Sequence, residues 1–268
     1  MSGPAAGERA PAAAPRSRRS RAELRDLLIE AGMAILMEEG LGTGAENLTF
    51  KRVFERVAAT QGIRITNASV IGRVWQNQAE YQSAVLAAVA AEELDVLTID
   101  AADVARRVVA DADRSTLDGR RRALSELARR AGEADLQMIA ASGSWVATVG
   151  VWALSSAAPR SDEDDVRTAL RAGFAAIAEA NLAFARTLQD DLGLRLRTGL
   201  ELDHFVLSAT ALIKGCALRD RADPLALHGI MRPTGPDGAE QEWTILGVGL
   251  EALFDEYFEL DPAWRPGP

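Results

Sequence analysis

The chain is poor in the residues that metal sites and catalytic centres use most often. Its 268 residues include one cysteine and two histidines. The single cysteine, Cys216, excludes an internal disulfide and a cysteine-based zinc site. His204 and His228 offer little material for acid–base catalysis, and the common metalloprotease, serine-hydrolase and phosphate-loop motifs are absent. We therefore expect no metal, no cofactor and no enzyme activity, and keep an all-α enzyme only as the weakest alternative.

Long apolar runs are also missing. No stretch of about 18 uncharged apolar residues occurs, which a membrane-spanning helix would need. The longest candidate, residues 140–158, is interrupted by serines and glycines and is typical of a buried helix. The N-terminal arginines are not followed by the apolar segment of an export signal. These absences predict a soluble protein without a membrane span, located in the cytoplasm.

Basic residues are outnumbered by acidic residues, but unevenly along the chain. The net charge is −9. Residues 1–85 hold 11 basic and 9 acidic residues, whereas residues 86–268 hold 19 basic and 30 acidic residues. A mildly basic head on an acidic body suits a DNA-binding protein. An excess of two charges over 85 residues also fits a head that makes no DNA contact.

The N-terminal segment has two parts. Residues 1–15 are rich in alanine, proline and glycine and cannot bury enough apolar surface to fold. Four arginines follow within six residues. We predict a disordered basic arm over residues 1–21 that enters the DNA minor groove; the alternative is a solvated basic tail. The predicted DNA-contacting residues of the arm are Arg16, Arg18, Arg19 and Arg21.

Helical periodicity begins directly after the arm. A first helix ends at Gly40, and a second begins after Thr49 as N-cap and ends near Gly62. A third, capped by Thr66 or Asn67, is predicted to run to about residue 74, and a fourth covers about 79–97. Three short helices followed by a long one predict a helix-turn-helix whose third helix enters the major groove. A three-helix bundle without a DNA role gives the same pattern.

The predicted third helix has two faces. On its helical period, Ile71 and Trp75 are expected to hold the core while other positions face outward. The residues predicted to contact DNA outside the arm are Thr49, Asn67, Ala68, Ser69, Val70, Arg73 and Gln78.

The stretch 22–92 resembles the DNA-binding domain of tetracycline-repressor (TetR) type regulators. In that family the first helix ends in Glu-Gly, the second opens with Leu-Thr, and the second closes with Val-Ala and a later glycine. The matching positions here are Glu39-Gly40, Leu48-Thr49, Val57-Ala58 and Gly62. From Ser69 through Trp75 to Tyr81, the spacing of the third-helix motif matches without gaps.

The sequence departs from the family at contact positions. Gly72 replaces a tyrosine, Val74 a frequent histidine, and Gln78 a phosphate-binding lysine; residues 63–65 lengthen the preceding turn. The resemblance implies a homodimeric repressor that binds an inverted-repeat operator in double-stranded DNA and is loosened by a small-molecule effector. The alternative is a TetR-like fold that serves as a protein-interaction partner without sequence-specific DNA binding.

The remainder, residues 93–268, is predicted to be a helical ligand-binding and dimerisation domain, so that the whole chain is all-α. Predicted helices cover about 100–112, 116–136, a segment around 138–152, a long helix after residue 165, 201–219 and 241–259. The arginines at 120–122 are expected to form a solvated face. A loop rich in proline and glycine is expected before the last helix.

Two sites are predicted in this second domain. A stripe of aromatic side chains with one polar position suits a pocket for a mainly apolar ligand, although plain core packing is the alternative. The predicted pocket residues are Met138, Trp145, Val149, Trp152, Phe174 and Asn181. The resemblance implies that the last two helices pair with their copies. The predicted dimer-interface residues are Phe205, Leu212, Leu246, Leu250, Leu253 and Phe254.

Overall fold

The computed structural model describes residues 19–39, 45–92, 99–157, 165–234 and 238–267. Within these residues the chain is helical apart from two small sheets, which confirms the all-α class. The α-helices are α1 (Arg21–Glu39), α2 (Phe50–Gln61), α3 (Asn67–Val70), α4 (Gln78–Glu92), α5 (Ile99–Asp111), α6 (Leu117–Ala141), α7 (Gly143–Ala157), α8 (Asp165–Leu192), α9 (Leu202–Ala222) and α10 (Ile245–Tyr257). Short 3₁₀ turns are η1 (Ala45–Asn47) and η2 (Pro224–Leu227), and the strands are β1 (Leu194–Leu196), β2 (Ile230–Pro233), β3 (Glu240–Trp243) and β4 (Phe258–Leu260).

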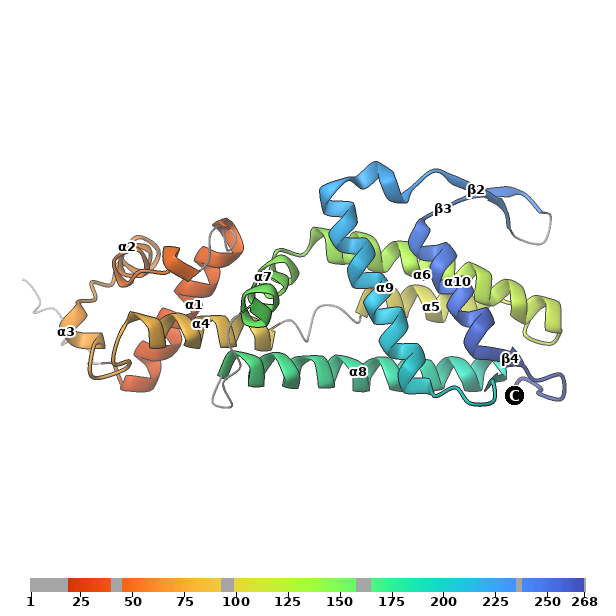
Figure 1. The fold of residues 1–268 in the computed structure, drawn as a ribbon, viewed down its shortest axis with the longest axis horizontal. Helices are drawn as coiled ribbons and strands as arrows, with labels where there is room; N and C mark the ends of the chain where they lie inside the picture. Colours follow the sequence, from red (N-terminus) through yellow and green to blue (C-terminus); the bar gives the residue numbers. More distant parts are fainter. Residues whose placement is uncertain (1–18, 40–44, 93–98, 158–164, 235–237, 268) are drawn as a thin grey trace, which may run out of the picture.

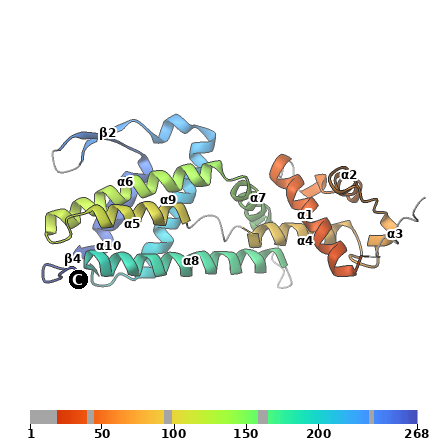
Figure 2. The ribbon, with the colours of Figure 1, turned by 180° about the vertical axis from the view of Figure 1, so that it is seen from behind.

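The molecule is elongated, with a head of α1 to α4 at one end (Figure 1). The body at the other end contains α5, α6, α9 and α10. Helix α7 lies between the two, and α8 runs from beside the head along the body. From behind, α5, α6 and α8 lie in front of α9 and α10 (Figure 2). The body therefore has α9 and α10 on one face.

Local sequence fixes the second helix of the head. The hydroxyl of Thr49 accepts a hydrogen bond from the backbone N–H of Arg52, which confirms the predicted N-cap. Gly62 ends the helix with φ 68°, and its N–H donates to the carbonyl of Ala58. Glycine adopts this left-handed conformation without the penalty of a Cβ atom.

The third helix is shorter than predicted. It covers only Asn67–Val70, and Gly72 turns the chain with φ 75°. The N–H of Gly72 donates to the carbonyl of Trp75 at 2.8 Å, which closes a turn in place of a second helical turn. The helical period therefore fails after Val70. Ile71, predicted to be in the core, is 45% exposed, whereas Val70 and Val74 are buried; Trp75 is buried as predicted.

Tyr81 is the centre of the head's core. Its ring packs against Trp75 and Phe50, with ring centroids 4.9 and 5.1 Å away. Its hydroxyl donates a 2.9 Å hydrogen bond to the carbonyl of Leu28. Burial raises the pKa of the Tyr81 phenol above its ordinary value. The side chain thus joins α1, α2 and the turn before α4.

The core of the head extends beyond residue 92. Ala147 and Val151 of α7 and Val166 and Leu170 of α8 belong to the same buried cluster as the helices of the head. The head is consequently packed against the body by shared side chains, and is not a separate module on a linker.

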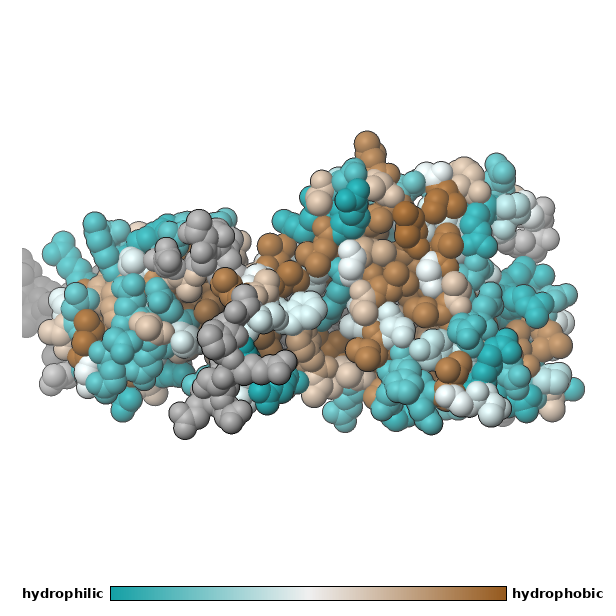
Figure 3. Space-filling view, in the orientation of Figure 1, coloured by the Kyte–Doolittle hydropathy of each residue, from teal (hydrophilic) through white to brown (hydrophobic). Residues whose placement is uncertain are grey.

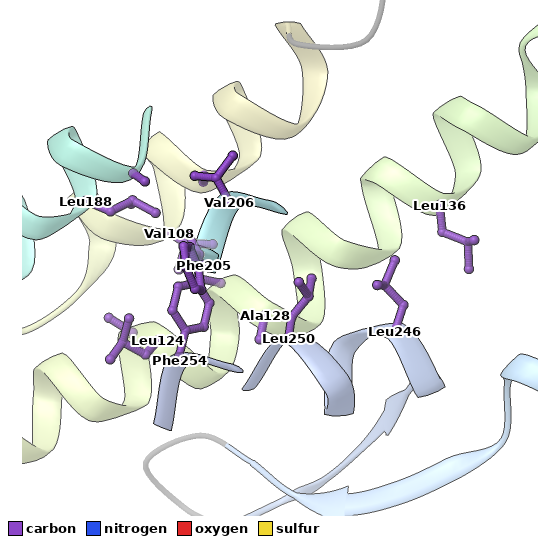
Figure 4. Close-up of a cluster of buried hydrophobic side chains, with 14 of the residues drawn as sticks. Val108, Leu124, Ala128, Leu136, Leu188, Phe205, Val206, Leu246, Leu250 and Phe254 are labelled. Carbon is purple, nitrogen blue, oxygen red and sulfur yellow. The ribbon is translucent and has the colours of Figure 1, made fainter. Parts of the chain in front are cut away.

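A second cluster fills the body between α5, α6, α8, α9 and α10. Figure 4 shows part of it, with Phe205 of α9 close to Phe254 of α10 and side chains of α6. The ring centroids of Phe205 and Phe254 lie 5.4 Å apart. Cys216 is buried in this cluster.

Arg120 is buried, against the prediction of a solvated arginine face. It is only 2% exposed, and its guanidinium donates to the carbonyls of Leu192 at 3.0 Å and Asp261 at 2.8 Å. The ring of Trp264 covers it at 4.9 Å. Arg120 therefore ties the chain's last residues to the end of α8, beside the β1–β4 pair.

Two other predictions in the body need correction. Helix α6 continues to Ala141, so Met138 is on a different helix from Trp145, with a bend of 77° between α6 and α7. The expected loop before the last helix contains the antiparallel hairpin β2–β3. No single described helix has the length and hydropathy of a membrane span; α6 and α7 reach them only when joined across their bend.

We expect Gly32→Ala to destabilise the head. A Cβ atom on Gly32 would lie 2.4 Å from the Tyr81 hydroxyl and 2.8 Å from a methyl group of Val85. Overpacking of this kind costs about 1–3 kcal/mol, which exceeds the helix-propensity gain of roughly 0.5–1 kcal/mol. Chemical denaturation measures the change. Gly143→Ala is the control, because its nearest contact would be an ordinary 3.8 Å; equal stabilities of the two variants would contradict this packing.

Candidate functional site

One groove of the head gathers polar side chains from three segments. It lies where α2, α3 and α4 begin, and so brings together the predicted residues Thr49, Asn67 and Gln78. Backbone N–H groups at helix starts attract phosphate oxygens. The groove is lined by Thr49, Phe50, Lys51, Phe54, Asn67, Ile71, Gln76, Asn77 and Gln78.

The predicted DNA-contacting residues of the α3 segment do not all face outward. Asn67, Ala68 and Arg73 are exposed, as expected. Val70 is fully buried, so its prediction is wrong. The hydroxyl of Ser69 is used in capping: it donates to the Thr66 carbonyl at 2.6 Å and accepts from the Thr66 N–H. The turn at Gly72 determines which residues of this segment face outward, and a helical period alone could not predict that turn.

Gln78 connects two helix starts. Its side-chain oxygen accepts a hydrogen bond from the N–H of Phe50 at 3.4 Å. Next to it, Asn77 caps α4 by accepting from the N–H of Glu80, and Glu80 accepts from the N–H of Gln76. Gln78 thus holds α4 against α2, whereas Gln76 and Asn77 are exposed lining residues that the sequence analysis missed.

The basic residues of the head fall into two groups. Arg52 and Arg56 form ion pairs with Glu39 and Glu38 at the end of α1. The hydrogen bond from Arg56 lowers the pKa of the Glu38 carboxyl. Both arginines therefore connect α2 to the end of α1. Other basic side chains near the groove and the turns are exposed, and one of them, Lys51, lies 4.0 Å from the carboxylate of Glu55 on the same helix. They are Lys51, Arg64 and Arg73.

Most of the predicted arm lies outside the described residues. Arg16 and Arg18 lie outside the described residues, and Arg19 is exposed. Arg21, assigned to the arm, is instead the first residue of α1. Its guanidinium donates to the carbonyl of Val74 at 3.5 Å, so the described chain starts beside the turn that carries Arg73.

A second candidate site is a cavity inside the body. It measures about 120 Å³ and lies between α6, α8, α9 and α10. Its wall is mainly apolar, with one ionisable residue, Asp135. The lining residues are Leu127, Ala128, Ala131, Gly132, Asp135, Asn181, Phe184, Ala185, Leu188, Phe205, Val206, Ala209, Thr210, Ile213, Leu250 and Phe254.

Three polar side chains interrupt the apolar wall. The amide of Asn181 donates to the hydroxyl of Thr210 at 3.3 Å, which links α8 to α9. Asp135 is half-buried and lines the same cavity from α6, and the loss of hydration in this apolar wall raises the pKa of its carboxyl to about 7. Asn181 was predicted from the sequence; Asp135 and Thr210 were not.

The other predicted pocket residues are not in the cavity wall. Trp145 is fully buried in the body core, and Met138 and Val149 pack against that core. Trp152 is 44% exposed and meets Phe174 edge-on, with ring centroids 5.7 Å apart. The aromatic stripe therefore divides between core packing and a surface cluster, and only Asn181 of the predicted set reaches the cavity.

The predicted dimer-interface residues lie mainly on the sides of α9 and α10 that pack into the protomer's own core. Phe205, Leu246, Leu250 and Phe254 are buried in the protomer's own core, and Leu212 and Leu253 are half-buried against it. The exposed sides of these helices carry apolar residues beside charged ones such as Arg219, Asp255 and Glu256. We name this surface the α9–α10 face; it consists of Leu207, Ala211, Gly215, Leu218 and Ala222 on α9 and Ile245 and Ala252 on α10. Figure 3 shows hydrophobic atoms gathered over this part of the body.

Metal chemistry finds no support in the part of the chain that the structure describes. No group of three or more His, Cys, Asp or Glu side chains there is placed to hold a metal ion. His204 is exposed, and His228 lies 3.5 Å from the carboxylate of Asp220.

Comparison with known proteins finds similarity to solved structures alone. No protein-family model matches the sequence, and no curated protein matches it. The structure of SmeT, the repressor of the Stenotrophomonas maltophilia multidrug efflux pump SmeDEF, is 15% identical over 91% of this chain and 94% of that chain, with a TM-score of 0.41. A SmeT–triclosan complex is 14% identical over 92% and 96%, with a TM-score of 0.45. Because both TM-scores lie below 0.5, these structures assign no role to any residue of this chain.

We expect the stability of the protein to depend on the protonation of Asp135. Its folded-state pKa of about 7 exceeds the ordinary value, so ionisation disfavours folding. The cost is absent below pH ~4, grows as the pH rises towards 7, and is complete above it. Asp135→Asn should therefore stabilise the protein by on the order of 2–4 kcal/mol at pH 8 and have little effect at pH 4.

Denaturant unfolding at both pH values measures this difference. The control is Asp118→Asn, which removes an equal charge from an exposed position on the same helix. A pH-independent effect of Asp135→Asn would contradict the raised pKa.

Proposed function

We propose that this chain is a homodimeric transcription regulator of the TetR type, which binds double-stranded DNA through its head and is released by a small molecule in the body cavity. The observation that carries the proposal is the groove at the starts of α2, α3 and α4, with exposed polar and basic side chains around it. A repressor of this kind acts where the DNA is, in keeping with the expected cytoplasmic location.

The head offers the two kinds of contact that DNA recognition needs. Asn67 and Arg73 are exposed on the α3 segment, and both residue types form paired hydrogen bonds with base edges. Lys51 and Arg64 are suited to phosphates, which fix orientation without reading sequence. The basic arm adds further phosphate or minor-groove contacts, because the described chain starts beside the same turn.

Dimerisation is proposed through the α9–α10 face. Two heads must lie ~34–36 Å apart to enter successive major grooves, so a regulator of this kind works as a two-fold pair. On α9 the exposed positions recur every three or four residues and include Leu207, which is 69% exposed. Gly215 in the same stripe leaves open space above the helix, which allows close approach of a second helix.

Helix α8 provides the proposed connection between ligand and DNA. Its first turns, with Val166 and Leu170, are part of the core of the head. Farther along the same helix, Asn181 and Leu188 line the cavity. A ligand that prefers one position of α8 would shift the population between DNA-binding and released dimers, by no more than its differential affinity for the two states.

The second candidate function is a protein-interaction partner with a TetR-like fold. Two observations favour it: the third helix has a single turn, and Val74, at a family contact position, is buried. An all-α enzyme has no comparable support among the described residues, since no catalytic grouping occurs around the cavity.

Selection of sheared genomic DNA by the purified protein at ~150 mM salt tests the proposal. We expect an inverted repeat to be enriched. Arg73→Ala should weaken binding to that repeat by about 1–3 kcal/mol, because a base or phosphate contact is lost. Arg130→Ala is the matched control, since it removes an exposed arginine from the body. Absence of any enriched sequence would favour the protein-interaction alternative.

We expect Leu207→Glu together with Leu218→Glu to make the protein monomeric. Both side chains are exposed on α9, so the change places charges in the proposed interface without disturbing the core. Analytical ultracentrifugation measures the molecular mass. Leu117→Glu serves as the control because Leu117, at the start of α6, is 42% exposed, close to the 45% of Leu218. A double variant that stays dimeric would exclude this face.

A further inference from the structure

The cavity contains a carboxylate without a basic partner. Asp135 of α6 lines the cavity together with Phe184, Phe205 and Phe254. It is the one ionisable residue among those lining the cavity. Burial is the sole cause of its raised pKa, so no neighbouring cation in the described chain stabilises its charged form.

Charged groups on the surrounding helices have other contacts. On α9, the Lys214 ammonium lies 4.6 Å from the ring centroid of Phe174, and Arg221 donates to the carbonyl of Ala140 at 2.7 Å. On α10, Glu251 forms an ion pair with Arg232 at 2.7 Å. On α8, Glu179 and Arg186 are exposed. Within the described residues, none of them lines the cavity.

An ionised carboxylate in such a wall is stabilised best by a cation from outside. Taking a charge out of water without a partner costs free energy, and a hydrogen-bonded counter-ion recovers part of it. An anionic ligand would be repelled by Asp135, and a purely apolar ligand would leave the carboxylate unpaired. The cavity therefore discriminates by charge as well as by shape.

We propose that this cavity binds aromatic amines, with the ammonium group paired to Asp135 and the ring held among the phenylalanine and leucine side chains. The Asn181–Thr210 pair offers further hydrogen-bonding groups beside the ammonium. The volume of about 120 Å³ suits a single ring, since an engineered cavity of ~150 Å³ binds benzene. The inference rests on the proposed function in treating this cavity as the effector site, and it adds the chemical class of the effector.

Benzylamine and toluene are matched probes, because they differ mainly by the ammonium group. We expect the wild-type dimer at pH 8 to bind benzylamine about tenfold or more tightly than toluene, as a charge-assisted hydrogen bond contributes on that scale. Asp135→Asn should remove the preference while leaving toluene binding unchanged. Asp118→Asn, the exposed control on the same helix, should retain it. Isothermal titration calorimetry measures all three proteins.

The pH provides a second test that needs no variant. Benzylamine stays protonated at pH 5.5 and at pH 8, whereas Asp135, with a pKa of about 7, is largely neutral at the lower value. The preference of the wild-type protein for benzylamine should therefore shrink at pH 5.5. A preference that is absent at pH 8, or that survives both low pH and Asp135→Asn, would overturn the inference.

Release of operator DNA separates this inference from the proposed function. If benzylamine binds through Asp135 but the DNA stays bound, the amine site is supported and its role as the effector site is excluded. If neutral aromatic compounds release the DNA while the cavity binds benzylamine no more tightly than toluene, the proposed regulator function is supported and the amine site is excluded.

Discussion

The sharing of α7 and α8 between two hydrophobic cores is the constraint on which the rest of the structure depends. Val166 and Leu170 at the start of α8 are buried in the head, while Leu188 and Leu192 near its end are buried in the body. At ~1.5 Å per residue, the 28 residues of α8 extend ~42 Å. Protein interiors are close-packed, so a helix held at both ends transmits a displacement of one end to the other.

Helix α4 completes the path between the two sites. It begins at the groove, where Gln78 contacts the first residue of α2, and its far end lies against α8. A Cβ atom on Gly173 of α8 would lie 3.1 Å from the carbonyl of Ala90, so the two helices approach closely there. From this contact, two turns along α8 lead to Asn181 in the cavity wall. A change in cavity occupancy therefore has a short, packed route to the groove of the head.

The parts of the fold that could be predicted from the sequence depend on neighbouring residues. Thr49 begins α2 and Gly62 ends it, both through contacts within a few positions, so their roles were predicted correctly. The burial of Arg120 depends on carbonyls 72 and 141 residues away, which no local pattern indicates. Helices α9 and α10 carry apolar residues on more than one side, and periodicity alone could not determine which of them the protomer buries. Most of the predicted interface residues therefore fall on the side that the protomer buries, and the pairing of these helices stays a prediction.

Asp135 is a further residue whose environment a local sequence pattern could not predict. Between Gly132 and Leu136 on a charged helix it has the local pattern of a solvated residue, and only α8, α9 and α10 together enclose it. A leucine at this position would remove the cost of desolvating a charge. The carboxylate therefore works against stability in the empty protein. Because an ionised Asp135 lowers stability in this mainly apolar wall, a cation paired with it would offset that cost, which is the physical basis of the proposed amine site.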